Sequence, residues 1–185
     1  GAGRSFVFAL MVDGSAVSVT CTIADTATSC ADTSNTASVS AGQLVALRAT
    51  PSGFPTSDFL QWTVEFDGTT AAESIQMGNT ENNNIGASEY MSISGAAATN
   101  ATLINRETVS PTTGTIKSLY VRIVTAPGAG TSRTFTVFDD GSSTALACTI
   151  ADAATTCNDT SDSFATTAAE GITVQATVSG AVAAT

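Results

Sequence analysis

The amino-acid sequence predicts an all-β protein, an antiparallel jelly roll or β-sandwich made of tandem partial repeats with hairpin disulfides. Three observations lead to this fold class. Short segments with alternating apolar residues are separated by Gly, Pro and Asx turns, as in sandwich proteins. No segment shows helical periodicity over a convincing length. The chain also contains an internal repeat that carries two cysteine pairs of identical spacing.

The repeat is clearest in a Cys-x8-Cys stretch at 21–30, which returns nearly unchanged at 148–157, 127 positions later. At this offset the two copies align without a gap, and about two-fifths of the overlapping positions are identical. A chain of 185 residues holds one full period and less than half of the next. We therefore expect two β-sandwich units: residues 1–83, which close one repeat, and residues 84–185, which open another.

Composition excludes several classes of partner. The chain has a formal net charge of −10, and its six basic residues stand singly in the sequence. Binding to nucleic acid needs clusters of Lys and Arg that neutralise phosphates, so no nucleic-acid partner is expected. No apolar run approaches the roughly 20 residues of a membrane-spanning helix, so no membrane span is expected either.

The four cysteines indicate the compartment. Zinc sites use closer spacings and often His, and the chain has no His. The spacing instead predicts two local disulfides, Cys21–Cys30 and Cys148–Cys157, each across a short hairpin, and an oxidising, extracellular environment. The alternative is that all four cysteines are reduced and buried as small apolar residues.

In the first copy, five segments are expected to be strands. They lie at 1–13, 17–23, 38–40, 44–50 and 59–66. Asp13-Gly14 is a hairpin signal between the first two. The last is the most aromatic, with apolar side chains in strict alternation: Leu60, Trp62, Val64 and Phe66.

The middle of the chain is polar and without periodicity from 69 to 86, and the unit boundary is placed at 78–84. Strands are then expected at three places before the second copy begins. They lie at 88–94, 104–109 and 116–124. The final strand of the second copy is expected at 172–176.

From about Ser88 onward the order of elements is similar to that of a known family. The segments that carry the similarity are 117–121, 126–130, 135–137, 140–141, 148–150, 159–161 and 172–176. They resemble the C-terminal jelly-roll domains of bacterial collagen-like, spore-surface and phage tail proteins, relatives of the C1q/TNF-like sandwich. The resemblance implies a structural or receptor-binding protein, usually trimeric and without enzymatic activity. The chain departs from the pattern because the second copy stops before any counterpart of the 60–66 strand.

No catalytic constellation stands out. Without His, neither a Ser-His-Asp nor a Cys-His arrangement is possible. Carboxylates at Glu65, Asp67, Asp139 and Asp140 are the candidates for a glycosidase pair, but few aromatic residues are present to line a sugar cleft. We expect that the protein is not an enzyme.

No resident cofactor is expected, and calcium is left open. Calcium takes oxygen ligands only, and the repeated Asp residues Asp25, Asp32, Asp152 and Asp159 are the candidates. The alternative is that these side chains form turns, as Asx residues often do.

Assembly is the function that the repeat pattern favours. A sandwich without its closing strand exposes an apolar face and unpaired backbone groups, which a strand from a neighbour satisfies together. The second copy lacks a counterpart of the strand with Leu60, Trp62, Val64 and Phe66, our candidate assembly strand. The first copy lacks strands equivalent to those with Tyr90 and Tyr120. The alternative is that the missing strands lie outside this stretch of sequence.

These observations predict an extracellular structural protein that polymerises head to tail with itself in a surface filament, sheath or matrix. The alternative function is a binding module, such as a phage tail or capsid-surface protein or a bacterial adhesin, that recognises glycans through its loops.

Overall fold

The computed structural model describes residues 3–55, 63–70, 73–80, 85, 87–96 and 98–180. These residues are almost entirely strand, turn and extended chain, which confirms the all-β class. The single helical element among them is a 3-10 turn, η1 (Leu103–Asn105). By their contacts the residues divide into two compact units, Gly1–Glu65 and Phe66–Thr185, whereas the sequence places the boundary between 83 and 84.

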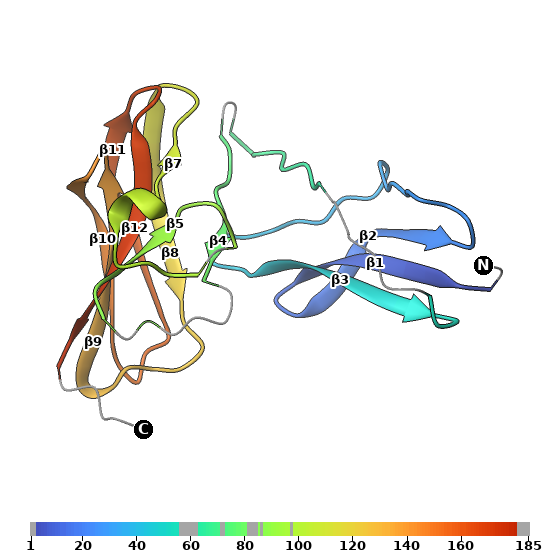
Figure 1. Ribbon diagram of the computed structural model, residues 1–185, viewed down its shortest axis with the longest axis horizontal. Helices are drawn as coiled ribbons and strands as arrows, with labels where there is room; N and C mark the ends of the chain where they lie inside the picture. Colours follow the sequence, from blue (N-terminus) through green and yellow to red (C-terminus); the bar gives the residue numbers. More distant parts are fainter. Residues whose placement is uncertain are drawn as a thin grey trace. The chain divides into compact units, whose positions relative to one another are not determined.

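The first unit contains one antiparallel sheet with the strand order β2-β1-β3 (Figure 1). Its strands are β1 (Ser5–Val12), β2 (Ser15–Ala24) and β3 (Val45–Ser52). Asp13 and Gly14 connect β1 to β2 with φ values of 46° and 79°. Two consecutive positive φ values fit a tight hairpin turn, so the predicted Asp-Gly hairpin is confirmed.

The second unit contains most of the strands. They are β4 (Gly78–Asn79), β5 (Glu89–Ser92), β6 (Gly95–Ala96), β7 (Thr108–Val109), β8 (Gly114–Arg122), β9 (Gly128–Asp139), β10 (Ser142–Asp152), β11 (Thr156–Thr166) and β12 (Gly171–Ser179). The main sheet has the order β10-β9-β12-β5, with β7 also on β12, and β11 pairs with β8 in a second sheet (Figure 1). These ladders are antiparallel; the short pair β4–β6 is parallel.

The core of the second unit lies between these two sheets. Two clusters of buried side chains come from β9, β10 and β12: Phe135, Ile150 and Ala176 in one, and Val137, Leu146 and Ile172 in the other. Apolar residues of β8 and β11 pack against both clusters: Ile116, Leu119, Val121, Cys157 and Phe164. The second unit is therefore two-layered and sandwich-like, with β8 and β11 as the covering layer.

The two units share strand order and register at the offset of 127. In the first unit Phe8 lies opposite Cys21, and in the second Phe135 lies opposite Cys148. The order β2-β1-β3 corresponds to β10-β9-β12, and both hairpins close with an Asp-Gly turn. Sequence similarity between the copies is thus accompanied by the same local geometry.

Two segments that were expected to be strands carry none in their described residues. Residues 38–40, expected to be a strand, carry none, and neither do 63–66, the described part of the segment expected at 59–66. An extended segment becomes a strand only when a partner takes up its N–H and C=O groups. The counterpart of 38–40 lies at the end of β11, whose partner is β8.

Three further details differ from the sequence prediction. Residues 104–109 were expected to be extended, but η1 occupies their beginning and only β7 is a strand. Strand β3 continues beyond the expected 44–50 through Pro51; because β3 is an edge strand, a residue without N–H is tolerated there. Strand β11 was not predicted, because its sequence is polar and lacks apolar alternation.

Candidate assembly face

The inner face of β9, β10 and β12 shows how a sheet of this type is normally covered. Leu146, Ile150 and Ile172 are no more than 2% exposed, because the layer of β8 and β11 excludes water from them. From β8, Ile116 and Leu119 pack on one cluster and Val121 on the other. Burial of a large aliphatic side chain stabilises by about 1.5–3 kcal/mol, so this covering layer is a large part of the unit's stability.

The equivalent face of the first unit carries the same kind of side chain but less cover. Its six equivalents of the clustered core residues are all apolar: Phe8, Leu10, Val19, Ile23, Val45 and Ala49. Phe8 and Leu10 on the central strand are buried, whereas Val19, Ile23 and Val45 are only partly buried and Ala49 is exposed. Among residues 3–55, which the structure describes, no second sheet lies over this face. We call these six residues the open face.

Both predicted disulfides are present, Cys21–Cys30 and Cys148–Cys157. They indicate an oxidising environment of the extracellular type. In the second unit the disulfide joins β10 to β11. In the first unit it joins β2 to residues 29–39, the equivalent of β11, which carry no strand. We call residues 29–39 the tethered segment.

A carboxylate makes the second connection between the tethered segment and β2. Asp32 Oδ2 accepts the backbone N–H of Thr20 at 2.9 Å, and its Oδ1 accepts those of Ser34 and Asn35 at 3.3 and 3.1 Å. The Asn35 amide also donates to both oxygens. These donors, the Asn35 side chain first and the Thr20 N–H next, hold the pKa of Asp32 well below its ordinary value.

The same carboxylate turn recurs in the second unit. Asp159 Oδ2 accepts the N–H of Ala147 at 3.1 Å, and its Oδ1 accepts those of Ser161 and Asp162, each at 3.1 Å. The Asp162 N–H is the main cause that lowers the pKa of Asp159 to about 2. The turn therefore forms whether or not a β8-type strand is paired beside it.

The remaining two candidate calcium ligands hold the start of each copy. Asp25 Oδ1 accepts the N–H of Gly3 at 2.6 Å, and Asp152 Oδ1 accepts that of Gly130 at 2.8 Å. Within the described part of the chain, no three His, Cys, Asp or Glu side chains are grouped so as to hold a metal ion. Each of the four carboxylates thus has a structural role in a turn or at a strand end.

The candidate assembly strand is only partly visible. Leu60 and Trp62 lie outside the described residues. Val64 and Phe66 are 48% and 44% exposed, in a stretch without secondary structure. In the second unit the covering strand is β8, which precedes β9, β10 and β12 in the chain. The role assigned to Leu60, Trp62, Val64 and Phe66 stays a prediction.

One carboxylate pair in the second unit was not singled out from the sequence. Thr166 Oγ1 lies 3.3 Å from Asp139 Oδ1 and 3.2 Å from Glu170 Oε2. Burial and then the nearby Glu170 charge raise the pKa of Asp139, whereas the Thr167 N–H lowers that of Glu170. The two residues are 31 positions apart, and only the pairing of β9 with β12 brings them together.

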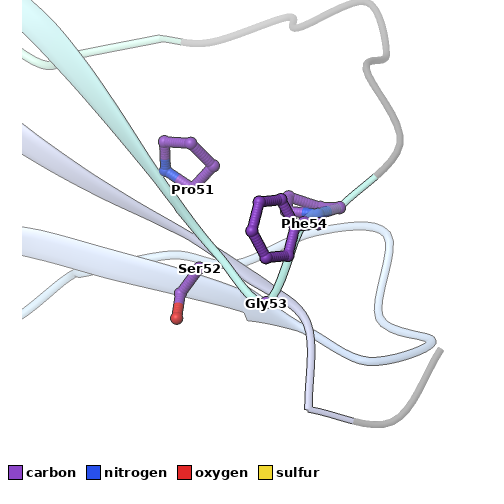
Figure 2. Close-up of a pocket in the computed structure, with 5 residues that line it drawn as sticks. Pro51, Ser52, Gly53 and Phe54 are labelled. Atoms are coloured by element: carbon purple, nitrogen blue, oxygen red, sulfur yellow. The ribbon is translucent and has the colours of Figure 1, made fainter.

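A shallow concavity of about 350 Å³ lies at the end of β3 (Figure 2). It is lined by Pro51, Ser52, Gly53, Phe54 and Pro55. The Phe54 side chain is 96% exposed. Ser52 supplies the single polar side chain of this lining, so the concavity has no charged or catalytic group to offer a ligand.

Comparison with known proteins gives no further assignment. No family model, curated protein or solved structure matches the chain. The resemblance to C1q/TNF-like jelly rolls therefore stays a prediction. Among the described residues, no helix is long and apolar enough to cross a membrane.

Proposed function

We propose that this chain is a secreted structural protein, a subunit of a surface filament, sheath or matrix assembled by strand complementation between repeat units. The observation that carries the proposal is the contrast between two sheets of equal register. One is covered by β8 and β11, and the other has an apolar face with no covering sheet among the described residues. Each uncovered sheet of this kind is an acceptor for a strand.

The order of elements along the repeat supports head-to-tail assembly. A three-stranded sheet comes first, and β8, which covers the next sheet from the second layer, follows it in the chain. The described residues hold two such sheets but one covering layer, β8 with β11, which already covers the second sheet. The first sheet would therefore take its covering strand from a further copy of the repeat unit, which produces an open, heterologous contact.

Tandem jelly-roll architecture belongs to this proposal. It rests on the 127-residue repeat, the equal register of the two sheets and the two disulfides in equivalent places. The disulfides also support an extracellular location, because such bonds persist in oxidising compartments. We propose no enzymatic function, because the sequence has no His and offers few aromatic residues to line a sugar cleft.

The proposal is tested by immunogold electron microscopy of the native material with antibodies against this chain. We expect label along regular filaments, sheaths or a continuous matrix outside the cell. Label on discrete particles, together with a compact soluble trimer that binds a glycan array, would contradict the proposal and favour the adhesin or tail-protein alternative.

A further inference from the structure

We infer that the open face of the first sheet is the acceptor for a β8-type strand from a second copy of the repeat unit, and that the tethered segment pairs with this strand. The inference rests on the proposed function and deepens it, because it names the donor, the acceptor and their register.

The second unit supplies the geometry of the complex. There β8 places Ile116, Leu119 and Val121 on the two core clusters while its backbone pairs with β11. The open face presents apolar residues at all six equivalent positions. A β8-type strand laid on it therefore meets the same kind of surface that β8 covers in its own unit.

The register follows from the ladder between β8 and β11. Val121 lies opposite Cys157, Leu119 opposite Asp159, and Ile116 opposite Phe164. At the offset of 127, the same donor residues face Cys30, Asp32 and Ala37 of the tethered segment. The last pair differs, because alanine stands where the second unit has phenylalanine, so the donor's isoleucine meets a smaller neighbour there.

The tethered segment is held in place before any strand arrives. The disulfide fixes it at Cys30, and the Asp32 carboxylate fixes it to Thr20 and shapes the turn at Ser34 and Asn35. The equivalent turn at Asp159 lies where the β11–β8 ladder shifts register, between Asp159 and Ser163. Because these contacts already exist, less conformational entropy is lost when the donor binds.

Charge favours the same occupant. Strand β8 contains Lys117 and Arg122, two of only six basic residues in a chain of net charge −10. It has no acidic residue. Attraction between a cationic strand and an anionic protein accelerates the encounter and weakens with salt. A second open face has no such complementarity, since it would bring two anionic units together.

The probe is a synthetic peptide with the sequence of Gly114–Arg122, added to the full 185-residue chain. Binding is followed by fluorescence anisotropy of the labelled peptide and located by hydrogen exchange. We expect saturable binding and slower exchange of the tethered segment, with no change in β11, which is already paired. A peptide with Leu119→Asp should bind at least about tenfold more weakly, because it places a charge against apolar side chains.

Two protein variants of equal charge provide the matched control. Val19→Asp puts the charge on the open face and should also weaken binding at least about tenfold. Thr22→Asp puts it on the opposite, exposed side of the same strand and should leave binding unchanged. The peptide variant keeps the test decisive if Val19→Asp does not fold.

Three outcomes would overturn the inference. The peptide does not bind, or protection appears outside the tethered segment, or both peptides bind equally well. If the chain dimerises without peptide and Val19→Asp abolishes the dimer, then the partner of the open face is the open face of a second molecule, and the inference is wrong. If native filaments are seen but the peptide does not bind, this inference is refuted and the proposed function stands. If the peptide binds but no native filaments are seen, the inference stands and the proposed function is refuted.

Discussion

The sheet β2-β1-β3 and the equivalent strands β10-β9-β12 have the same order and register, yet only the second set has a closed core. Strand β11 and the tethered segment carry the same disulfide and the same carboxylate turn, but only β11, which has β8 beside it, is a strand. Local sequence thus determines the hairpin, the turn and the covalent link, whereas strand formation and core burial depend on a partner that is distant in sequence.

The largest expected difference between the sheets concerns equivalent core positions. Leu146→Ala removes a side chain that is 1% exposed and should lower the free energy of unfolding of the second unit by about 3 kcal/mol. Val19→Ala, the change at the equivalent position of the open face, should lower the free energy of unfolding of the first unit by about 1 kcal/mol or less. Denaturant titration of both variants measures the difference. Equal losses would mean that the open face is covered as fully as the other.

The disulfides sharpen the comparison in a second way. Both close loops with a sequence separation of 9, so removal of either pair by double Cys→Ala substitution should destabilise its unit by about 2–3 kcal/mol. The structural consequences should differ. Loss of Cys21–Cys30 should make the tethered segment a site of rapid proteolysis, while β11 remains paired with β8 after loss of Cys148–Cys157. Limited proteolysis followed by mass spectrometry measures the cleavage rate at each site. Equal cleavage of the tethered segment and of β11 would contradict the expected difference.

A smaller effect is expected at a turn that the two sheets share. Thr167 and Glu170 are joined by a backbone hydrogen bond across a turn whose third residue, Ala169, has a φ of 77°. The first unit has Gly42 there, with a φ of 82°. Because left-handed backbone is unfavourable for residues with a Cβ, Ala169→Gly should raise stability by about 1 kcal/mol. Gly42→Ala should lower it by a similar amount. Thermal melts of the pair test both signs.

The smallest effect concerns pH. The pKa of Asp159 is lowered from 3.8 to about 2 in the folded protein, so its stabilisation is present above pH 4 and is lost as the pH falls towards 2. Asp159→Asn should flatten the loss of stability in that range. The pKa of Asp139 is raised, so its effect on stability has the opposite sign. The protonated carboxyl favours the fold at low pH, and this contribution weakens as the pH rises through the raised pKa. Acid titrations followed by circular dichroism compare the variants, and an unchanged curve for Asp159→Asn would contradict this assignment.

Much of the local structure could be predicted from the sequence. Apolar alternation located the strands β1, β2, β5, β8 and β12, the Asp-Gly signal located the first hairpin, and the cysteine spacing gave both disulfides. These features depend on residues close together in the chain, where periodicity and turn chemistry are informative.

The covering layer could not be predicted in the same way. The apolar residues of β11 that pack on the core are Cys157 and Phe164, and the rest of the strand is mostly polar. Its strand character comes from its pairing with β8. Ser118, with a φ of 62°, lies where this ladder shifts register and interrupts the apolar alternation of β8. Sequence reasoning therefore chose 59–66 as the candidate assembly strand, although it also counted the strand with Tyr120, which is β8, among those that the first copy lacks.

The position of β8 ahead of β9, β10 and β12 has a consequence for protein synthesis. On the ribosome, β8 is complete at Arg122, but its partner β11 ends only at Thr166. At about 5–20 residues per second, β8 waits for several seconds with its apolar side chains unprotected. Exposed apolar strands of this kind favour aggregation, so the chain passes through a vulnerable stage during its synthesis, which ends when β11 pairs with β8.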